Sequence, residues 1–181
     1  RERARGRAMA SSSSSLAARV ARTVDAMPPP ADPVNQTSSG GDFMVDVLKT
    51  LDIEYLAMNC ASSFRGLHEA VINHGGNKKP EIITCPHEEI AVHMGQGYAN
   101  MEGKPLAMIC HGVVGLQHAS MAMYNAWCDR VPVIVMGGNI MEADKRAPGA
   151  EWPHSAIDPA ALTRDFVKWD DQPRSEERRV G

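Results

Sequence analysis

The sequence predicts an α/β fold of three layers, in which a parallel β-sheet carries helices on both faces. Short apolar segments alternate along the chain with segments of helical periodicity about 10–15 residues long, which is typical of β-α-β units. The apolar segments also lack the polar–apolar alternation of half-exposed strands, so both faces of the sheet are expected to be covered.

The first half of the ordered part predicts two helices and two strands. Asp42 is expected to cap the first helix, which carries apolar residues at helical spacing: Phe43, Val47, Leu48 and Leu51. The elements expected after it are a strand over 55–58, a helix over 64–72 that ends at Gly75 and Gly76, and a strand over 81–85.

The second half continues the alternation. A helix over 88–101 is expected to stop at Gly103 and Pro105. The elements expected after it are a strand over 105–110, a helix over 115–128, a strand over 131–137, a short helical turn over 159–163 and a last strand over 166–169.

Both ends of the chain differ from this body, which spans residues 42–172. Residues 1–41 are basic and rich in Ser and Pro, and such a composition cannot bury enough apolar surface to offset its ordering entropy. They resemble a transit peptide, and a disordered extension or translated upstream sequence are the alternatives. Residues 173–181 resemble translated adapter sequence or a charged tail. Both ends are expected to be disordered.

Composition excludes several functional classes. The chain has 181 residues, a formal net charge of −3 and 43% hydrophobic residues, so bulk charge does not indicate a nucleic-acid partner. No apolar run approaches the ~20 residues that cross a membrane. Four cysteines occur without a CxxC pair: Cys60, Cys85, Cys110 and Cys128. They are interpreted as reduced thiols of the core, which predicts a reducing compartment such as the cytoplasm.

Several familiar site motifs are absent. His87 and His93 lie six residues apart, about 240° around a helix, so they do not form a helical zinc pair and no metal site is predicted. Gly95-Gln96-Gly97 lies inside a predicted helix rather than between a strand and a helix, and position 100 is not Gly. The sequence contains neither a GxxxxGK[ST] loop nor a GxSxG turn.

Three segments at predicted strand ends, where ligands meet parallel sheets, carry the candidate site. They are Asn59-Cys60-Ala61-Ser62-Ser63, His87-Glu88 followed by Gly97-Tyr98-Ala99, and His111-Gly112-Val113-Val114-Gly115-Leu116-Gln117-His118. Together they resemble the N-terminal pyrimidine-binding (PYR) domain of thiamine-diphosphate-dependent enzymes of the acetolactate synthase and benzoylformate decarboxylase group. The resemblance covers about residues 42–172.

The resemblance implies a catalytic and cofactor-binding role for Glu88. Its carboxyl group would hydrogen-bond N1′ of the aminopyrimidine ring and so favour the imino tautomer that activates the cofactor, which acts as an electron sink. The alternative is an acidic residue that only favours the helix N-terminus. Glu89, about 100° further around the helix, is expected to be structural.

Three further residues are candidates by the same resemblance. His111 matches an active-site histidine, with a hydrogen-bonded structural role as the alternative. Ser62 matches a polar residue on the substrate side, and Gln117 is a candidate for the cofactor pocket, with turn formation or helix capping as the alternatives. The family often has Pro-Gly where this chain has Cys60-Ala61. Glycine permits conformations that alanine resists, so this turn is expected to differ.

The resemblance also implies what lies outside the chain. The diphosphate and its Mg²⁺ are expected to bind a GDG…N motif in a missing C-terminal domain, so this chain supplies half of a site and is expected to be inactive alone. The implied substrate is a 2-keto acid or an aldehyde. The competing hypothesis is a non-catalytic binding or oligomerisation module with the same fold.

Assembly is the last expectation from the sequence. The glycines of the 88–101 helix and a set of apolar residues exceed what a single domain needs: Met108, Met121, Met123 and Trp127. A homo-oligomer is therefore expected, with the Glu88 helix at or near its interface.

Overall fold

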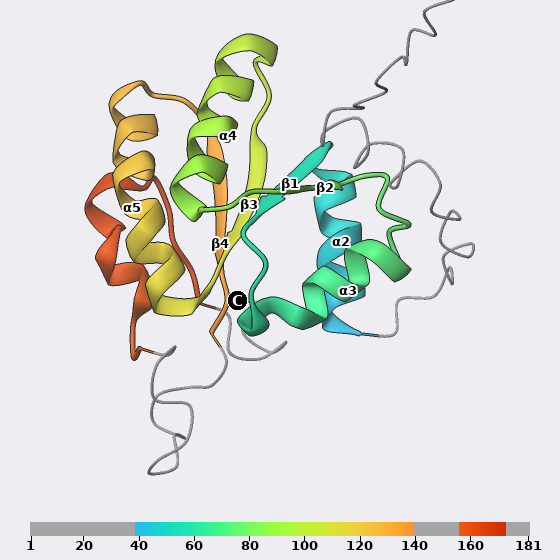
Figure 1. Ribbon diagram of the computed structural model, residues 1–181. Coiled ribbons are helices and arrows are strands. Elements are labelled where there is room, and N and C mark those ends of the chain that lie inside the picture. Colours follow the sequence, from blue (N-terminus) through green and yellow to red (C-terminus); the bar gives the residue numbers. More distant parts are fainter. Residues whose placement is uncertain (1–38, 140–155, 173–181) are drawn as a thin grey trace, which may run out of the picture. The chain divides into compact units, whose positions relative to one another are not determined.

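The structure, a computed structural model, describes residues 39–139 and 156–172 and contains one parallel sheet in that part of the chain. The strand order is β2-β1-β3-β4, and every neighbouring pair is parallel (Figure 1). The strands are β1 (Tyr55–Met58), β2 (Glu81–Thr84), β3 (Leu106–Cys110) and β4 (Val133–Gly137).

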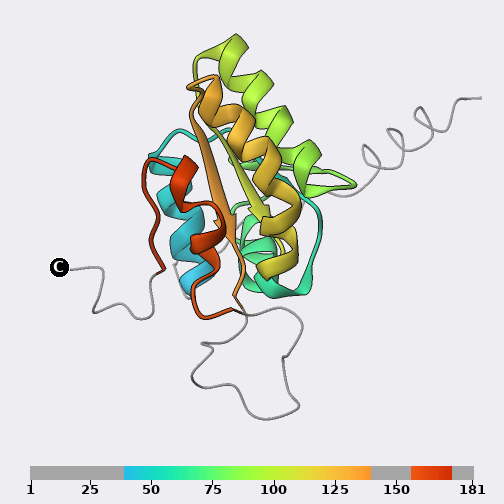
Figure 2. The same cartoon turned by 90° about the vertical axis from the view of Figure 1, so that its left-hand side faces the viewer.

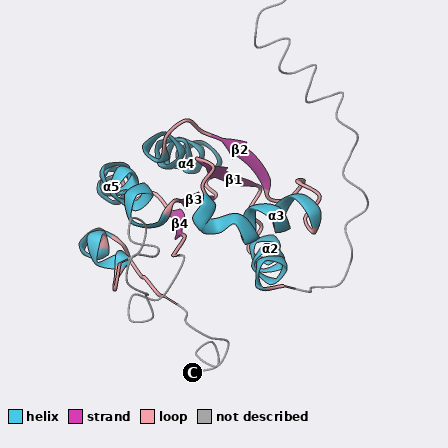
Figure 3. Ribbon diagram, turned by 60° about the horizontal axis from the view of Figure 1, so that its bottom comes forward, coloured by secondary structure: helices cyan, strands magenta, loops and turns pink. Residues whose placement is uncertain are grey.

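Helices cover both faces of this sheet, which confirms the predicted three-layer architecture. α2 and α3 lie on one face and α4 and α5 on the other (Figure 3). Their bounds are α2 (Gly40–Thr50), α3 (Arg65–Asn73), α4 (Glu88–Glu102) and α5 (Gly112–Cys128).

The two central strands, β1 and β3, divide their side chains between two cores. Leu56 and Met58 pack with α2 and α3, whereas the intervening Ala57 packs with α4 and α5. Because side chains alternate across a strand, a strand buried on both faces needs an unbroken apolar run. This confirms the prediction for β1 and β3, while the edge strands β2 and β4 are less buried.

The first helix differs from its predicted cap and face. Ser39 is the N-cap: its Oγ accepts a bond from the Asp42 N–H at 3.2 Å, and an Asp42 carboxylate oxygen accepts one from the Ser39 N–H at 3.0 Å. The predicted cap, Asp42, is therefore the third helical residue of a capping box. The helix begins at Gly40, two residues inside the segment assigned to the extension. Val45 and Leu48 form its buried face.

The buried face of α2 does not match the predicted one, which had Leu48 as its one correct member. The other three predicted residues are substantially exposed: Phe43, Val47 and Leu51. Their spacing suits a helix, but spacing alone does not fix which side of the helix meets the sheet.

The predicted last strand over 166–169 is wrong. Pro159–Leu162 (η3) and Arg164–Phe166 (η4) are 3₁₀ helices, and both contact α5 (Figure 2). The Arg164 guanidinium pairs with Asp158 and with Asp170, each six residues away, and these pairs fold the segment back on itself. A Trp169 side chain that is 78% exposed also argues against a buried strand.

Other boundaries shift by a few residues. Gly103 ends α4 with a left-handed φ of 69°, as its position predicted. α5 begins at Gly112, three residues before the predicted start. None of the helices in the described residues combines the length and the apolar composition that a membrane crossing needs.

The cysteines only partly match their predicted places. All four are free thiols, with Cys85 and Cys110 buried and Cys60 and Cys128 exposed. The prediction of core positions is therefore wrong for Cys60 and Cys128. Cys60 follows β1 outside the sheet, and Cys128 is the last residue of α5.

Candidate functional site

The candidate site lies where the chain changes direction within the sheet. From β1 the chain crosses to β2 on one side and then passes β1 to form β3 on its other side. The loops after β1 and β3 therefore diverge, and such a switch point leaves a ligand-binding crevice at the carboxyl ends of the strands. Residues 59–63, His87-Glu88 and residues 111–118 follow β1, β2 and β3 and so lie at this edge, whereas Gly97-Tyr98-Ala99 lies near the far end of α4, where Tyr98 bonds Glu54 ahead of β1.

Glu88 is the first residue of α4, and its side chain is buried. His87 caps the helix in an extended conformation, with its Nδ1 accepting a bond from the Glu89 N–H at 3.2 Å. Glu88 is only 3% exposed, whereas Glu89 is half-buried. A carboxylate in the first turn is favoured by the helix dipole. Residues 87–89 thus direct the Glu88 carboxylate inward.

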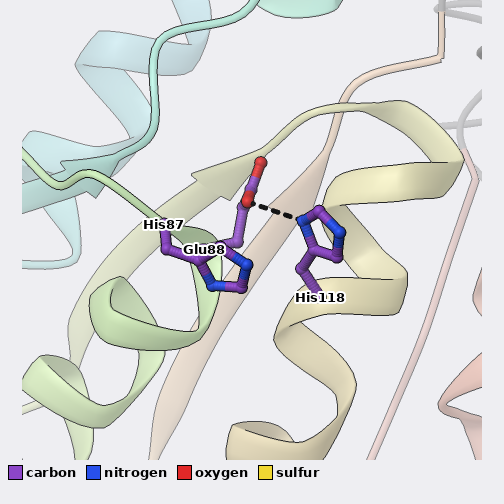
Figure 4. Close-up of side chains that lie close together, drawn as sticks. All are labelled: His87, Glu88 and His118. Atoms are coloured by element: carbon purple, nitrogen blue, oxygen red, sulfur yellow. Dashed lines mark hydrogen bonds and ion pairs between the residues drawn. The ribbon is translucent and has the colours of Figure 1, made fainter.

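Two histidines lie against this carboxylate (Figure 4). The Nδ1 atom of His118, on α5, lies 3.2 Å from a Glu88 carboxylate oxygen. The His118 ring stacks on the His87 ring with centroids 4.6 Å apart and an interplanar angle of 23°. The carboxylate is therefore held between the N-terminus of α4 and the second turn of α5.

The surroundings of Glu88 favour its ionised form. Burial raises the pKa of the carboxyl group, but hydrogen bonds from its own backbone N–H, from His118 and from the Asn59 side chain outweigh burial, so the pKa lies below its ordinary value. Neighbouring Cys110, at the end of β3, behaves oppositely. Burial, and then the Glu88 charge, raise the pKa of its thiol to about 12. The site thus holds one buried anion and a neutral thiol.

Gly115 leaves the space that the carboxylate occupies. A Cβ atom on this residue would lie 2.9 Å from a Glu88 carboxylate oxygen and 3.1 Å from the Cβ atoms of Cys110 and His111. Real Cβ atoms do not approach an oxygen this closely. Glycine at position 115 therefore lets α5 pack against β3 without displacing the Glu88 carboxylate.

His111 is held by Ser63, across the switch point. Ser63 Oγ accepts a bond from the Gly112 N–H at 3.1 Å and lies 2.7 Å from His111 Nδ1. A neutral His111 that accepts the Ser63 hydroxyl proton carries its own proton on Nε2. Gly138, after β4, permits this arrangement, because a Cβ there would lie 2.8 Å from Ser63 Cβ and its carbonyl oxygen.

The predicted Ser62 and Gln117 are placed differently from Glu88 and His111. The Ser62 side chain is exposed at the start of η1 (Ser62–Phe64), and Ser63 takes the position against His111. Gln117 is exposed on α5, next to His118. The structure thus places Glu88 and His111 on two sides of Gly115 and leaves Ser62 and Gln117 at the surface.

The turn at Cys60-Ala61, where the family often has Pro-Gly, does not require a glycine. Ala61 has a φ of −148° and a ψ of 159°, an extended conformation that any residue adopts. The turn after β1 therefore forms without the left-handed conformation for which glycine would be needed.

The donors at this site do not suit Mg²⁺, the ion that the resemblance implies. His87, Glu88 and His118 are the group of three potential ligands found within the described residues, with ligand atoms within 4.8 Å of one another. Imidazole lone pairs lie in the ring plane, so two stacked rings do not direct them at one point. Mg²⁺ prefers oxygen ligands, which this set lacks apart from Glu88. This group therefore does not fit Mg²⁺.

The sequence did not predict several contacts that complete the site. Asn59, Ser63, Gly115 and His118 all belong to the matched segments, but their contacts depend on how α4 and α5 pack on the sheet. Chemically, the arrangement presents a buried carboxylate that can hydrogen-bond a ring nitrogen, close to a histidine, a residue type that can give and take a proton near neutral pH.

The sequence of this chain matches a known protein family and several characterised proteins. The family model "Thiamine pyrophosphate enzyme, N-terminal TPP binding domain" matches residues 38–162. The chain is 29% identical over 103 residues to the acetolactate synthase large subunit of Haemophilus influenzae, covering 57% of this chain and 18% of that protein. It is 26% identical over 117 residues to benzoylformate decarboxylase of Pseudomonas aeruginosa, covering 60% and 22%.

The fold has solved counterparts as well. The crystal structure of benzoylformate decarboxylase from Polynucleobacter necessarius superposes with a TM-score of 0.61 at 17% identity, covering 74% of this chain and 24% of that one. The chain thus spans about a fifth of the length of the curated relatives it matches.

Proposed function

Because the chain belongs to the thiamine pyrophosphate enzyme family and carries its N-terminal TPP-binding domain, we propose that it supplies the pyrimidine side of a cofactor site. The proposed enzyme acts on a 2-keto acid or an aldehyde, as a carboligase or a decarboxylase. It resembles acetolactate synthase and benzoylformate decarboxylase in sequence.

The observation that carries the proposal is the buried carboxylate of Glu88 at the sheet's switch point. It is 3% exposed, begins a helix and accepts hydrogen bonds that keep it ionised. An ionised carboxylate in a pocket of low water content binds a protonated ring nitrogen strongly, because the charge-assisted bond is not shared with water. This is the chemistry that the N1′ atom of an aminopyrimidine requires.

Each residue of the candidate site has its own proposed role. When bound, thiamine diphosphate supplies an electron sink for carbon–carbon bond cleavage or formation. Glu88 holds a proton at N1′, and Gly115 leaves the room for its carboxylate. His111, oriented by Ser63, gives and takes a proton on the substrate side. Ser62 and Gln117, both exposed, are proposed to line the remaining pocket.

The other half of the site is proposed to lie outside this chain. The diphosphate and its Mg²⁺ would bind a C-terminal domain, because the group of His87, Glu88 and His118 contains a single carboxylate and does not fit that ion. A chain that spans about a fifth of its relatives' length would then bind the cofactor weakly and turn over no substrate by itself.

A matched pair of variants tests the role of Glu88. In the full-length protein, Glu88→Gln keeps the side-chain volume but cannot exchange a proton with N1′. Exchange of the cofactor C2 proton, followed by NMR, should slow by about 10²–10⁴-fold. The control is Glu89→Gln, one residue along the same helix, which should exchange at a rate close to that of the wild type.

The outcome also separates the two candidate functions. Equal exchange rates in the two variants would contradict the role of Glu88. A full-length protein that bound no thiamine diphosphate would instead favour the non-catalytic binding or oligomerisation module, which the comparisons do not favour over the enzyme.

His111 has a separate test. His111→Ala should leave C2-proton exchange near the wild-type rate and slow substrate turnover by about 10²-fold or more, because the proton transfer it performs is at the substrate. Loss of folding, or unchanged turnover, would point to the structural alternative in which the ring only bonds its neighbours.

We also propose that the full-length protein forms a homo-oligomer through α4 and α5. Met108 and Met123, part of the sequence argument, are core residues, whereas Met121 is 60% and Trp127 48% exposed. Gly97 on α4 borders open space, so another helix can approach closely there. Sedimentation velocity of the full-length protein tests the proposal, and a monomer would contradict it.

A further inference from the structure

His118 connects the buried Glu88 carboxylate to the solvent. The two side chains meet through His118 Nδ1 and a Glu88 oxygen, 3.2 Å apart. Their exposures are very different, since the Glu88 side chain is 4% exposed and the His118 side chain 53%. One end of the imidazole therefore contacts the buried oxygen while the rest of the ring reaches water.

The ring is held in this position although it is exposed. It stacks on His87, with ring centroids 4.6 Å apart and planes 23° from parallel (Figure 4). His87 is in turn fixed as the N-cap of α4, where its Nδ1 accepts the Glu89 N–H. His87 caps α4 and His118 lies on α5, and these two helices pack against each other, so the contact is part of the α4–α5 interface.

We propose that His118 is a positioning residue for Glu88, which holds the carboxylate by the Nδ1 contact and provides its proton path to water. The inference rests on the proposed function, because only a carboxyl group that takes up and releases a proton in each cycle needs such a path. Imidazole suits the task since its two nitrogens can exchange roles.

The proton balance of the path is simple. His118 Nδ1 gives its proton to the Glu88 oxygen, and His118 Nε2 takes one proton from water. The net result is one proton moved from the solvent to the carboxylate, with the imidazole in its other neutral tautomer. Reversal, or exchange through the imidazolium form, returns the ring to its starting state.

Other titratable groups around the carboxylate do not combine contact with exposure. Cys110 is fully buried, and burial raises the pKa of its thiol to about 12, so it stays neutral at physiological pH. His111 lies across the space left by Gly115 and is bonded to Ser63 through Nδ1. His87 stacks on His118, and its Nδ1 is used in the cap.

Loss of His118 should raise the pKa of the Glu88 carboxyl group. Desolvation raises the pKa of the Glu88 carboxyl, and the hydrogen bonds from its own backbone N–H, His118 and Asn59 lower it to below its ordinary value. Removing the imidazole removes one of the lowering contacts. The carboxyl group of a His118 variant should therefore hold its proton to higher pH than that of the wild type.

The first experiment needs no cofactor. The side-chain carboxyl carbon of Glu88 is titrated by ¹³C NMR in the 181-residue chain and in His118→Ala. Since hydrogen bonds to charged groups are worth about 1.5–3 kcal/mol, loss of this one should shift the ionisation equilibrium toward the acid by about tenfold. His118→Asn places an amide N–H near the position of Nδ1 and should restore most of the wild-type titration.

The control is another exposed histidine. His93, on α4, contacts Asn125 rather than Glu88. His93→Ala should leave the Glu88 titration unchanged. Circular dichroism of each variant establishes that it is folded, which is expected because His118 is largely exposed.

The second experiment separates positioning from proton transfer. In the full-length protein with thiamine diphosphate, His118→Asn keeps the hydrogen bond but cannot relay a proton, so C2-proton exchange should fall by about 10-fold or more. Added imidazole should restore part of that rate. An unchanged Glu88 titration in His118→Ala, or wild-type exchange in His118→Asn, would overturn the proposal.

The two proposals can fail separately. A wild-type protein that does not bind or activate thiamine diphosphate refutes the proposed function, whereas the titration of the chain without cofactor still decides whether His118 controls Glu88.

Discussion

Replacing Gly115 with alanine introduces a single methyl group at the most crowded point of the site. The new Cβ atom would lie 2.9 Å from a Glu88 carboxylate oxygen and 3.1 Å from the Cβ atoms of Cys110 and His111. The oxygen is at the end of a rotatable side chain and can move, whereas the two Cβ atoms are tied to the backbone. The substitution should therefore displace the carboxylate first and strain the packing of α5 on β3 second.

Two opposing terms set the stability of this variant. Overpacking of a dense core costs about 1–3 kcal/mol. Alanine within a helix gains about 0.5–1 kcal/mol over glycine. Gly97 offers a matched control, because it also lies within a helix but a Cβ there would meet nothing within 4 Å. The difference in unfolding free energy between Gly115→Ala and Gly97→Ala should thus be about 1–3 kcal/mol.

The effect on function should exceed the effect on stability. A displacement of about 1 Å in a catalytic group can cost about 10²-fold in rate. Urea unfolding of the 181-residue chain measures the stability difference, and C2-proton exchange in the full-length protein measures the functional one. If Gly115→Ala matched Gly97→Ala in both, the space around Glu88 would not be limiting and the reasoning would be refuted.

Two further predictions concern hydrogen bonds at opposite ends of the sheet. Ser63→Ala leaves the Gly112 N–H and His111 Nδ1 without this partner and should lower the unfolding free energy by about 1–3 kcal/mol, whereas Ser62→Ala, at an exposed position, should change it by less than about 0.5 kcal/mol in urea unfolding. Tyr98 donates to a Glu54 carboxylate oxygen at 2.7 Å, and this bond, with burial, raises the pKa of the phenol to about 12. Its stabilising effect should be full below about pH 10 and should disappear as the pH rises toward 12, and ultraviolet titration should show Tyr98 ionising at lower pH in Glu54→Gln.

The sequence predicted the layers of the fold because burial determines how apolar residues are spaced along the chain. β1 and β3 lie between two cores and are apolar without interruption, and the helices between strands repeat with a period near 3.6. The roles of single residues were harder to predict from the sequence. Ser39 and Asp42 both suit a helix start, and only the backbone shows that Ser39 is the cap.

Contacts between distant segments account for the remaining differences between the predicted site and the site in the structure. Whether Ser62 or Ser63 faces His111 depends on the 3₁₀ turn that follows β1. Likewise, His118 meets Glu88 only because α4 and α5 pack side by side, 30 residues apart in the chain. A single sequence carries no record of such packing, so the contact between Glu88 and His118 could not be predicted.

A group of charged residues lies at the amino ends of the strands, at the edge opposite the site. Lys79 pairs with Asp52, and Lys104 pairs with both Asp52 and Glu54. These side chains are 39–60% exposed, so each pair contributes little at physiological salt. They precede β1, β2 and β3, whereas the catalytic candidates follow the same strands. Surface charge at one edge can therefore be redesigned or drift in evolution, for tolerance to heat, salt or pH, without altering the chemistry at the other.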